Sequence, residues 1–103
     1  MRVLVTGATG LVGNALARRL CDRGHWVRAL VRDPDKATSI LPAAVDLRRG
    51  DITDPATLRD AMQDVELVFH AAGMPEQWQR DDSIFDRVNR QGTANVMVAA
   101  LAA

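Results

Sequence analysis

Short apolar runs alternate with helical patterns along the whole chain. Three short runs bounded by turn residues are mainly apolar, which is typical of buried strands: residues 2–6, 26–31 and 65–71. A further short strand is predicted over residues 45–48, where apolar and polar positions alternate. The intervening positions have helical spacing over residues 11–23, 36–41, 54–63 and 81–103. This alternation predicts an α/β fold of three α/β/α layers around a parallel sheet. Right-handed crossovers then give the strand order 3-2-1-4.

Within the helices, apolar spacing also predicts which side faces the sheet. The first helix is expected to bury one face and to end at Gly24; this face carries Leu11, Ala15 and Leu16, with Leu20 one turn further on. Residues 33–35, Asp-Pro-Asp, are predicted to form a turn. One stripe of the last helix is expected to carry Ile84, Val88, Gly92 and Val96.

The first strand ends in a glycine-rich turn that opens the first helix. Gly7 lets the chain turn sharply, Gly10 leaves room for a ligand near the backbone, and Gly13 lets the helix lie close to the sheet. The helix start offers unpaired N–H groups and a positive dipole end, which suits a pyrophosphate. The residues assigned to this site are Gly7, Thr9, Gly10, Leu11, Val12 and Gly13. The alternative is an ordinary glycine-rich turn between a strand and a helix.

Charge and cysteine content narrow the possible functions. The 13 basic and 13 acidic residues balance, so bulk electrostatics indicate neither nucleic acid nor a membrane surface as a partner. Cys21 is the only cysteine, which excludes an intrachain disulfide and predicts no metal site; a small packed residue is favoured over a reactive thiol. Without a leader-like segment or a run of membrane-spanning length, a cytoplasmic protein is expected.

Five segments together resemble the short-chain dehydrogenase/reductase superfamily, in its extended or atypical branch. They are Thr6–Gly13, Val31–Pro34, Gly50–Thr53, His70–Gly73 and Val88–Val96. That branch includes sugar-nucleotide epimerases and dehydratases, dihydroflavonol-type reductases and enzymes like 3β-hydroxysteroid dehydrogenase. The resemblance implies that residues 1–103 are a Rossmann-type NAD(P)-binding domain. It would be the N-terminal half of a longer, homodimeric enzyme that acts on a small molecule bearing a hydroxyl or carbonyl group.

The end of the second strand bears on the choice of dinucleotide. Val31 occupies the position where NAD-preferring members carry a carboxylate, and Arg32 follows it. A guanidinium there can bind a ribose 2′-phosphate, which favours NADP over NAD. Two alternatives remain: Arg32 is a solvated residue paired with Asp33 or Asp35, or Asp33 binds the ribose and restores NAD.

The resemblance assigns roles to residues after the third and fourth strands. Asp51 would accept a hydrogen bond from the adenine amine and Ile52 would pack on the ring, unless Asp51 only shapes the turn before Thr53. Small residues after the fourth strand would let the nicotinamide ribose approach the backbone. These are Ala71, Ala72 and Gly73. His70, inside an apolar run, is expected to be a packed structural residue.

The sequence offers one candidate catalytic residue. Asn89 matches the asparagine that supports the superfamily's proton relay, although an exposed polar residue of a long helix is the alternative. The chain contains no tyrosine, so the family's Tyr-x-x-x-Lys pair is missing and the chain alone is expected to be inactive. Two other functions stay open: a non-catalytic NADP-sensing module of the same fold, and a flavin protein.

Overall fold

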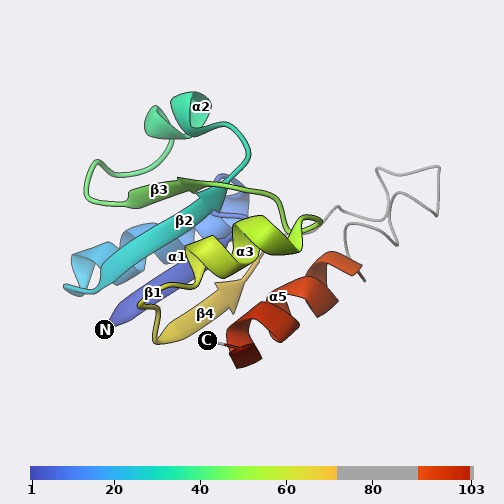
Figure 1. The fold of residues 1–103 in the computed structure, drawn as a ribbon. Helices are drawn as coiled ribbons and strands as arrows, with labels where there is room; N and C mark the ends of the chain where they lie inside the picture. Colours follow the sequence, from blue (N-terminus) through green and yellow to red (C-terminus); the bar gives the residue numbers. More distant parts are fainter. Residues whose placement is uncertain (72–90, 103) are drawn as a thin grey trace.

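The computed structural model describes residues 1–71 and 91–102. Strands and helices alternate along the chain (Figure 1). The elements are β1 (Arg2–Thr6), α1 (Leu11–Asp22), β2 (Trp26–Val31), α2 (Pro34–Thr38), β3 (Asp46–Arg49), α3 (Pro55–Ala61), β4 (Leu67–His70) and α5 (Gly92–Ala102). All strand pairs are parallel, and the order is β3-β2-β1-β4. The predicted fold class and strand order are therefore confirmed.

Helices cover both faces of the sheet, and each face has its own apolar core. On one face, Val3 and Val5 of β1 pack with small residues of α1 and α2, among them Ala17 and Ala37. On the other, residues of α3 and α5 pack over Leu4 of β1. The alternation of side chains along β1 explains this division, because successive residues of a strand point to opposite faces.

The predicted buried face of α1 is wrong at its start, although Leu20 packs partly buried against the core as predicted. Leu11 is 91% exposed and Ala15 is exposed, whereas Gly13 and Ala17 are buried. The two buried residues are one turn apart and have almost no side chain, so the helix backbone can lie close to the strands. Close approach at the glycine turn, rather than side-chain hydrophobicity, therefore sets which side of this helix faces the sheet.

The segment 33–35, predicted as a turn, instead begins a helix. The Asp33 side chain caps α2 by accepting a hydrogen bond from the Lys36 backbone N–H at 3.3 Å, and Pro34 is the first helical residue. Both residue types are preferred at these positions. The helix therefore starts and ends earlier than the predicted range of 36–41.

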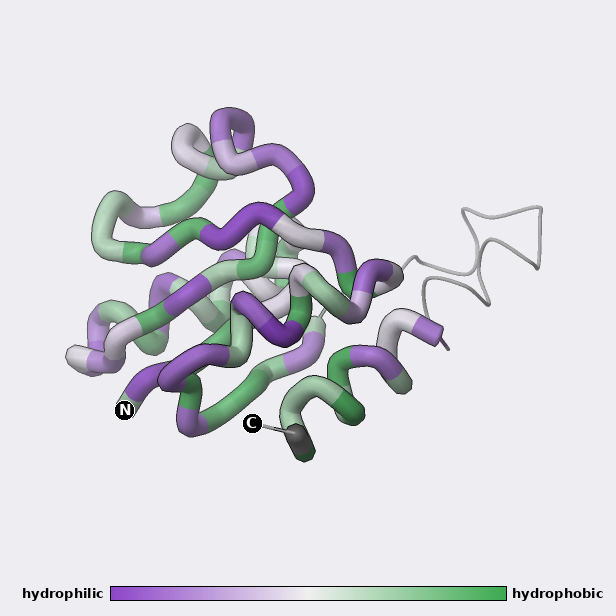
Figure 2. The backbone as a smooth tube through the Cα atoms, viewed as in Figure 1, coloured by the Kyte–Doolittle hydropathy of each residue, from purple (hydrophilic) through white to green (hydrophobic). Residues whose placement is uncertain are grey.

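The C-terminal helix is described only in part. Residues 81–90 of its predicted range, with Ile84 and Val88, lie outside the described residues. Gly92 and Val96 are buried, as predicted for this stripe. The outer side of α5 is apolar and exposed, and Figure 2 shows much of this helix in green. The exposed side chains are Met97, Val98 and Leu101.

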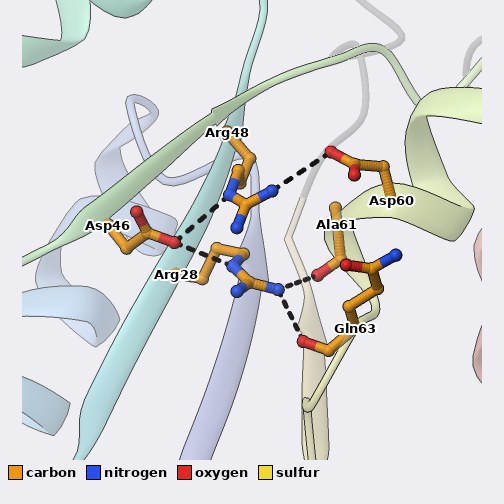
Figure 3. A network of polar contacts seen from close by, with 6 residues as sticks. All are labelled: Arg28, Asp46, Arg48, Asp60, Ala61 and Gln63. Atoms are coloured by element: carbon orange, nitrogen blue, oxygen red, sulfur yellow. Dashed lines mark hydrogen bonds and ion pairs between the residues drawn. The ribbon is translucent and has the colours of Figure 1, made fainter.

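A buried arginine ties the sheet to the end of α3 (Figure 3). Arg28 of β2 is 3% exposed, and its Nε donates to Asp46 Oδ2 of β3 at 2.9 Å. Its Nη1 donates to the backbone carbonyls of Ala61 and Gln63 at 2.7 and 2.8 Å. These bonds satisfy carbonyls at the end of a helix, where no intrahelical donor is available. The cation therefore links β2, β3 and α3.

Candidate functional site

A tight turn joins β1 to α1 at the carboxyl edge of the sheet. Gly7 has a φ of 69°, in the left-handed region that favours glycine, and its carbonyl accepts from the Gly10 N–H at 3.0 Å. A Cβ atom at Gly13 would lie only 2.1 Å from the Gly7 oxygen. The turn and the first helical turn are therefore packed backbone against backbone, as the roles predicted for these two glycines require.

The start of α1 presents backbone donors without a side-chain cap. Gly10 is the N-cap residue, and within residues 1–71 and 91–102 no side-chain hydrogen bond caps this end of the helix. The first three N–H groups of an α-helix have no intrahelical acceptor, and here they belong to Leu11, Val12 and Gly13. Thr9 and Gly10 beside them are exposed. This arrangement of donors at the positive end of the helix dipole suits an anionic group.

Two arginines lie at the carboxyl ends of β2 and β3, on one side of the glycine turn. Arg32, directly after β2, is exposed, and within residues 1–71 and 91–102 it forms no ion pair with Asp33 or Asp35. The predicted alternative of a paired, solvated Arg32 is therefore not seen there. Arg49 is the last residue of β3, is exposed, and lies in register with Val31. Sequence reasoning missed Arg49, although parallel strands ending at one edge could have indicated it.

The segment after β3 forms a hydrogen-bonded turn. Asp51 Oδ1 accepts from the Thr53 N–H at 2.9 Å and from the Thr53 hydroxyl at 2.8 Å. This oxygen shapes the turn, as the alternative reading of Asp51 expected. The Ile52 side chain is 7% exposed and belongs to the core shared by α3 and α5. Contact of either residue with adenine stays a prediction.

His70 is a structural residue at the end of β4. Its Nδ1 lies 2.6 Å from the Thr6 hydroxyl of β1, and its Nε2 lies 2.9 Å from the Thr93 hydroxyl of α5. Burial lowers the pKa of the imidazole below its ordinary value, which favours the neutral ring. Both ring nitrogens are thus engaged within the protein, which agrees with the structural role predicted from the sequence.

The remaining residues singled out from the sequence lie at or after the end of β4, or in α1. Ala71 extends the β1–β4 pairing, since its N–H donates to the Thr6 carbonyl at 3.2 Å, close to the glycine turn. Ala72, Gly73 and the predicted catalytic Asn89 lie outside the described residues. Cys21 is partly buried, and its pKa is raised by burial and, to a smaller extent, by Asp22, which disfavours the reactive thiolate.

The described residues contain neither a metal-binding cluster nor a membrane-spanning helix. In residues 1–71 and 91–102, no three histidine, cysteine or carboxylate side chains come together as metal ligands would. None of the helices described there has the length and apolar character needed to cross a membrane.

The glycine turn, Arg32, Asp51 and Ala71 all follow the carboxyl ends of strands. The sheet order reverses between β1 and β4, and ligands of open α/β sheets bind in the crevice outside the strand ends at such a reversal. A glycine turn leading to an uncapped helix start at this point is the arrangement that holds a dinucleotide pyrophosphate. The fold and the site define a Rossmann-type protein.

Comparison with known proteins identifies the family. Residues 3–103 match the NAD dependent epimerase/dehydratase family, and the chain belongs to it. It is 38% identical over 96 residues to a putative dihydroflavonol 4-reductase of Synechocystis, which covers 93% of this chain and 28% of that protein. It is 37% identical over 102 residues to 2-alkyl-3-oxoalkanoate reductase of Stenotrophomonas maltophilia, covering 99% and 30%. The chain thus spans less than a third of the length of these relatives.

Solved structures resemble the fold along nearly the whole chain. UDP-glucose 4-epimerase of Thermus thermophilus, in complex with NAD, has a TM-score of 0.85 and 28% identity, covering 96% of this chain and 33% of that one. A short-chain dehydrogenase/reductase superfamily protein of Agrobacterium tumefaciens with bound NAD has a TM-score of 0.81 and 29% identity, covering 99% and 29%. The resemblance to the short-chain dehydrogenase/reductase superfamily is therefore confirmed.

Proposed function

We propose that this protein binds an adenine dinucleotide as the cofactor-binding part of an oxidoreductase, epimerase or dehydratase. The observation that carries the proposal is the uncapped start of α1, packed through Gly13 against the Gly7 carbonyl. The pyrophosphate would accept hydrogen bonds from the N–H groups of Leu11, Val12 and Gly13, beside the exposed Thr9 and Gly10. The bound nicotinamide would supply hydride transfer with a small substrate bearing a hydroxyl or carbonyl group.

The rest of the cofactor would extend from the glycine turn to both sides. Arg32, together with Arg49, would bind a 2′-phosphate, so NADP is favoured over NAD. Asp33 would be less available to the ribose hydroxyls, because one of its carboxylate oxygens already caps α2. Asp51 and Ile52 would contact adenine, and Ala71, with the small residues that follow it, would lie beside the nicotinamide ribose.

An enzyme is favoured over a non-catalytic sensor because the relatives named above are reductases and an epimerase. The 103 residues contain no tyrosine, so they lack the superfamily's usual proton donor to the substrate. We therefore expect these residues to bind the cofactor without transferring hydride themselves. The exposed apolar side of α5 would serve a homodimer in the longer enzyme.

Replacing Gly10 by valine tests the proposal at its central point. Gly10 has a φ of −80° and a ψ of 171°, and an added Cβ would meet only the Gly7 oxygen at 3.4 Å. The backbone therefore accepts a side chain, but that side chain would occupy the space proposed for the pyrophosphate. We expect Gly10→Val to weaken NADPH binding by about tenfold or more, equivalent to about 1.4 kcal/mol. Titration of NADPH fluorescence measures this.

The control is Ala15→Val, which likewise introduces a valine into α1, on an exposed side of the helix. Unfolding in urea should be followed for both variants, since valine is a poorer N-cap residue than glycine. If Gly10→Val stays folded and binds NADPH as tightly as the wild type, the glycine turn does not hold the pyrophosphate and the proposed function is wrong.

Replacing Arg32 by alanine tests the cofactor preference. A charge-assisted contact with a phosphate contributes about 1.5–3 kcal/mol, so we expect Arg32→Ala to weaken NADPH binding by about tenfold or more. NADH, which lacks the 2′-phosphate, should bind nearly as before. Arg59→Ala is the control, because Arg59 is an exposed arginine in the last turn of α3. An unchanged ratio of NADPH to NADH affinity in Arg32→Ala would remove this residue from the site.

A further inference from the structure

We infer that α5 positions the adenine side of the cofactor site through Gly92 and Asn95. These two residues hold the turn at residues 50–53 in place. Their role at the adenine rests on the proposed function. Neither residue was assigned to the site from its sequence pattern. Both are at the start of α5, and both contact Ile52.

Asn95 fixes the backbone of the turn. Its Nδ2 donates a hydrogen bond to the Ile52 carbonyl at 3.0 Å, across more than forty positions of the sequence. That carbonyl lies in the turn between β3 and α3, outside the strands of the sheet. A side-chain amide from a different layer of the fold therefore determines where the residue after Asp51 lies.

Gly92 fixes the side chain of the same residue. A Cβ at Gly92 would come within 2.5 Å of Ile52 Cδ1 and 2.7 Å of its Cγ1. The Ile52 side chain thus occupies the space that any other residue at position 92 would fill. Since Ile52 is 7% exposed, the small part of it open to a ligand is set by this contact.

The start of α5 is itself anchored to the sheet. The Thr93 hydroxyl lies 2.9 Å from His70 Nε2, and the other nitrogen of this ring lies 2.6 Å from the Thr6 hydroxyl, one residue before the glycine turn. α5 therefore contacts the turn at 50–53 directly and reaches the glycine turn through His70. Its first turn connects the two segments that would hold opposite ends of the adenosine diphosphate.

The inferred function is one of positioning, because neither Gly92 nor Asn95 is placed against the ligand. Asp51 Oδ1 and Thr53 set the local turn, while Asn95 and Gly92 set its distance from the sheet edge. A shift of Ile52 would move Asp51 away from the adenine amine without altering the glycine turn. Adenine recognition should then weaken more than pyrophosphate binding.

The experiment compares each cofactor with its deamino form, in which hypoxanthine replaces adenine and the exocyclic amine is lost. The wild-type protein is titrated with NADPH and NADH, and the tighter ligand is then used with its deamino form. We expect Asn95→Leu, which has similar size but no donor, to reduce the preference for the amino form on the order of three- to tenfold. Asn95→Gln keeps an amide donor and should retain more of that preference than Asn95→Leu.

Two further variants separate positioning from folding. Asn14→Leu is the matched control, because Asn14 Nδ2 also donates to a backbone carbonyl, that of Ile40 at 3.2 Å, on the opposite face of the sheet. Gly92→Ala adds a helix-favouring methyl group that pushes on Ile52, so it tests the same contact if Asn95→Leu does not fold.

A change of the amino-to-deamino ratio in Asn95→Leu or Gly92→Ala, with the wild-type ratio in Asn14→Leu, supports the inference. The same ratio in all variants, or an equal change in Asn14→Leu, overturns it and leaves the proposed function standing. Absence of binding of both NADPH and NADH by the folded wild-type protein would overturn the proposed function, and the inference with it.

Discussion

Replacing Gly13 by alanine should lower the free energy of unfolding by about 2 kcal/mol or more. The added Cβ would lie 2.1 Å from the Gly7 oxygen, 2.6 Å from the Gly7 carbonyl carbon and 3.0 Å from the Ala8 Cα. All three are backbone atoms, so no side chain can move aside. Relief requires the glycine turn to open or α1 to move away from β1, and either change loses core contacts.

The helix propensity of the new residue works in the opposite direction. Alanine inside a helix is favoured over glycine by about 1 kcal/mol, so a site with free space would gain stability from this substitution. A measured loss therefore reports the close packing itself. Unfolding in urea, followed by circular dichroism, gives the difference in stability. The dependence of the unfolding free energy on urea concentration (the m value) should be the same for both proteins.

Gly10→Ser is the matched control for Gly13→Ala. A Cβ at Gly10 meets its nearest neighbour at 3.4 Å, an ordinary contact, and serine is a preferred N-cap residue. We expect this variant to be as stable as the wild type. A Gly13→Ala protein as stable as Gly10→Ser would show that the turn and helix are not packed as described, and the proposed pyrophosphate site would lose its geometric basis.

The sequence predicts the parts of this fold that depend on neighbouring residues. Alternating apolar runs and helical patterns were sufficient for the strand order, and the spacing of Gly7, Gly10 and Gly13 was sufficient for the turn. The buried side of α1 was missed because the pattern counted Leu11 as a core residue. In the structure, the closest approach belongs to Gly13 and Ala17 instead.

Contacts between distant layers could not be predicted in the same way. The Ile52 contact with Gly92 depends on how α5 crosses α3 and the sheet, which no local pattern encodes. Arg28 was not distinguished from the rest of its apolar strand, since burial of a cation there depends on partners that come from β3 and from the end of α3. Both features come from tertiary packing.

Replacing Asp46 by alanine should lower the stability of the fold, because it removes the carboxylate partner of a buried cation. Arg28 has 4% of its side chain exposed, and Asp46 Oδ2 lies 2.9 Å from its Nε (Figure 3). Removing the carboxylate leaves a buried cation with two carbonyl partners and with the Trp26 ring 4.8 Å from its guanidinium carbon. Loss of one partner typically costs about 3–5 kcal/mol for a fully buried pair. Because the Asp46 side chain is 36% exposed, solvent screens part of this loss, and we expect about 2 kcal/mol.

Asp60→Ala removes the same functional group from the same network and serves as the control. Asp60 Oδ2 lies 3.3 Å from Arg48 Nη1, but these side chains are 57% and 36% exposed. Exposed ion pairs contribute about 0.2–1 kcal/mol, so this variant should stay close to wild-type stability in urea. Asp46 Oδ2 also lies 3.4 Å from Arg48 Nε, so each variant removes one carboxylate partner of Arg48. The difference in stability between the two variants therefore reports the loss of the carboxylate partner of the buried Arg28. Equal losses would mean that Arg28 is solvated in solution, and that α3 is held to the sheet by its apolar contacts alone.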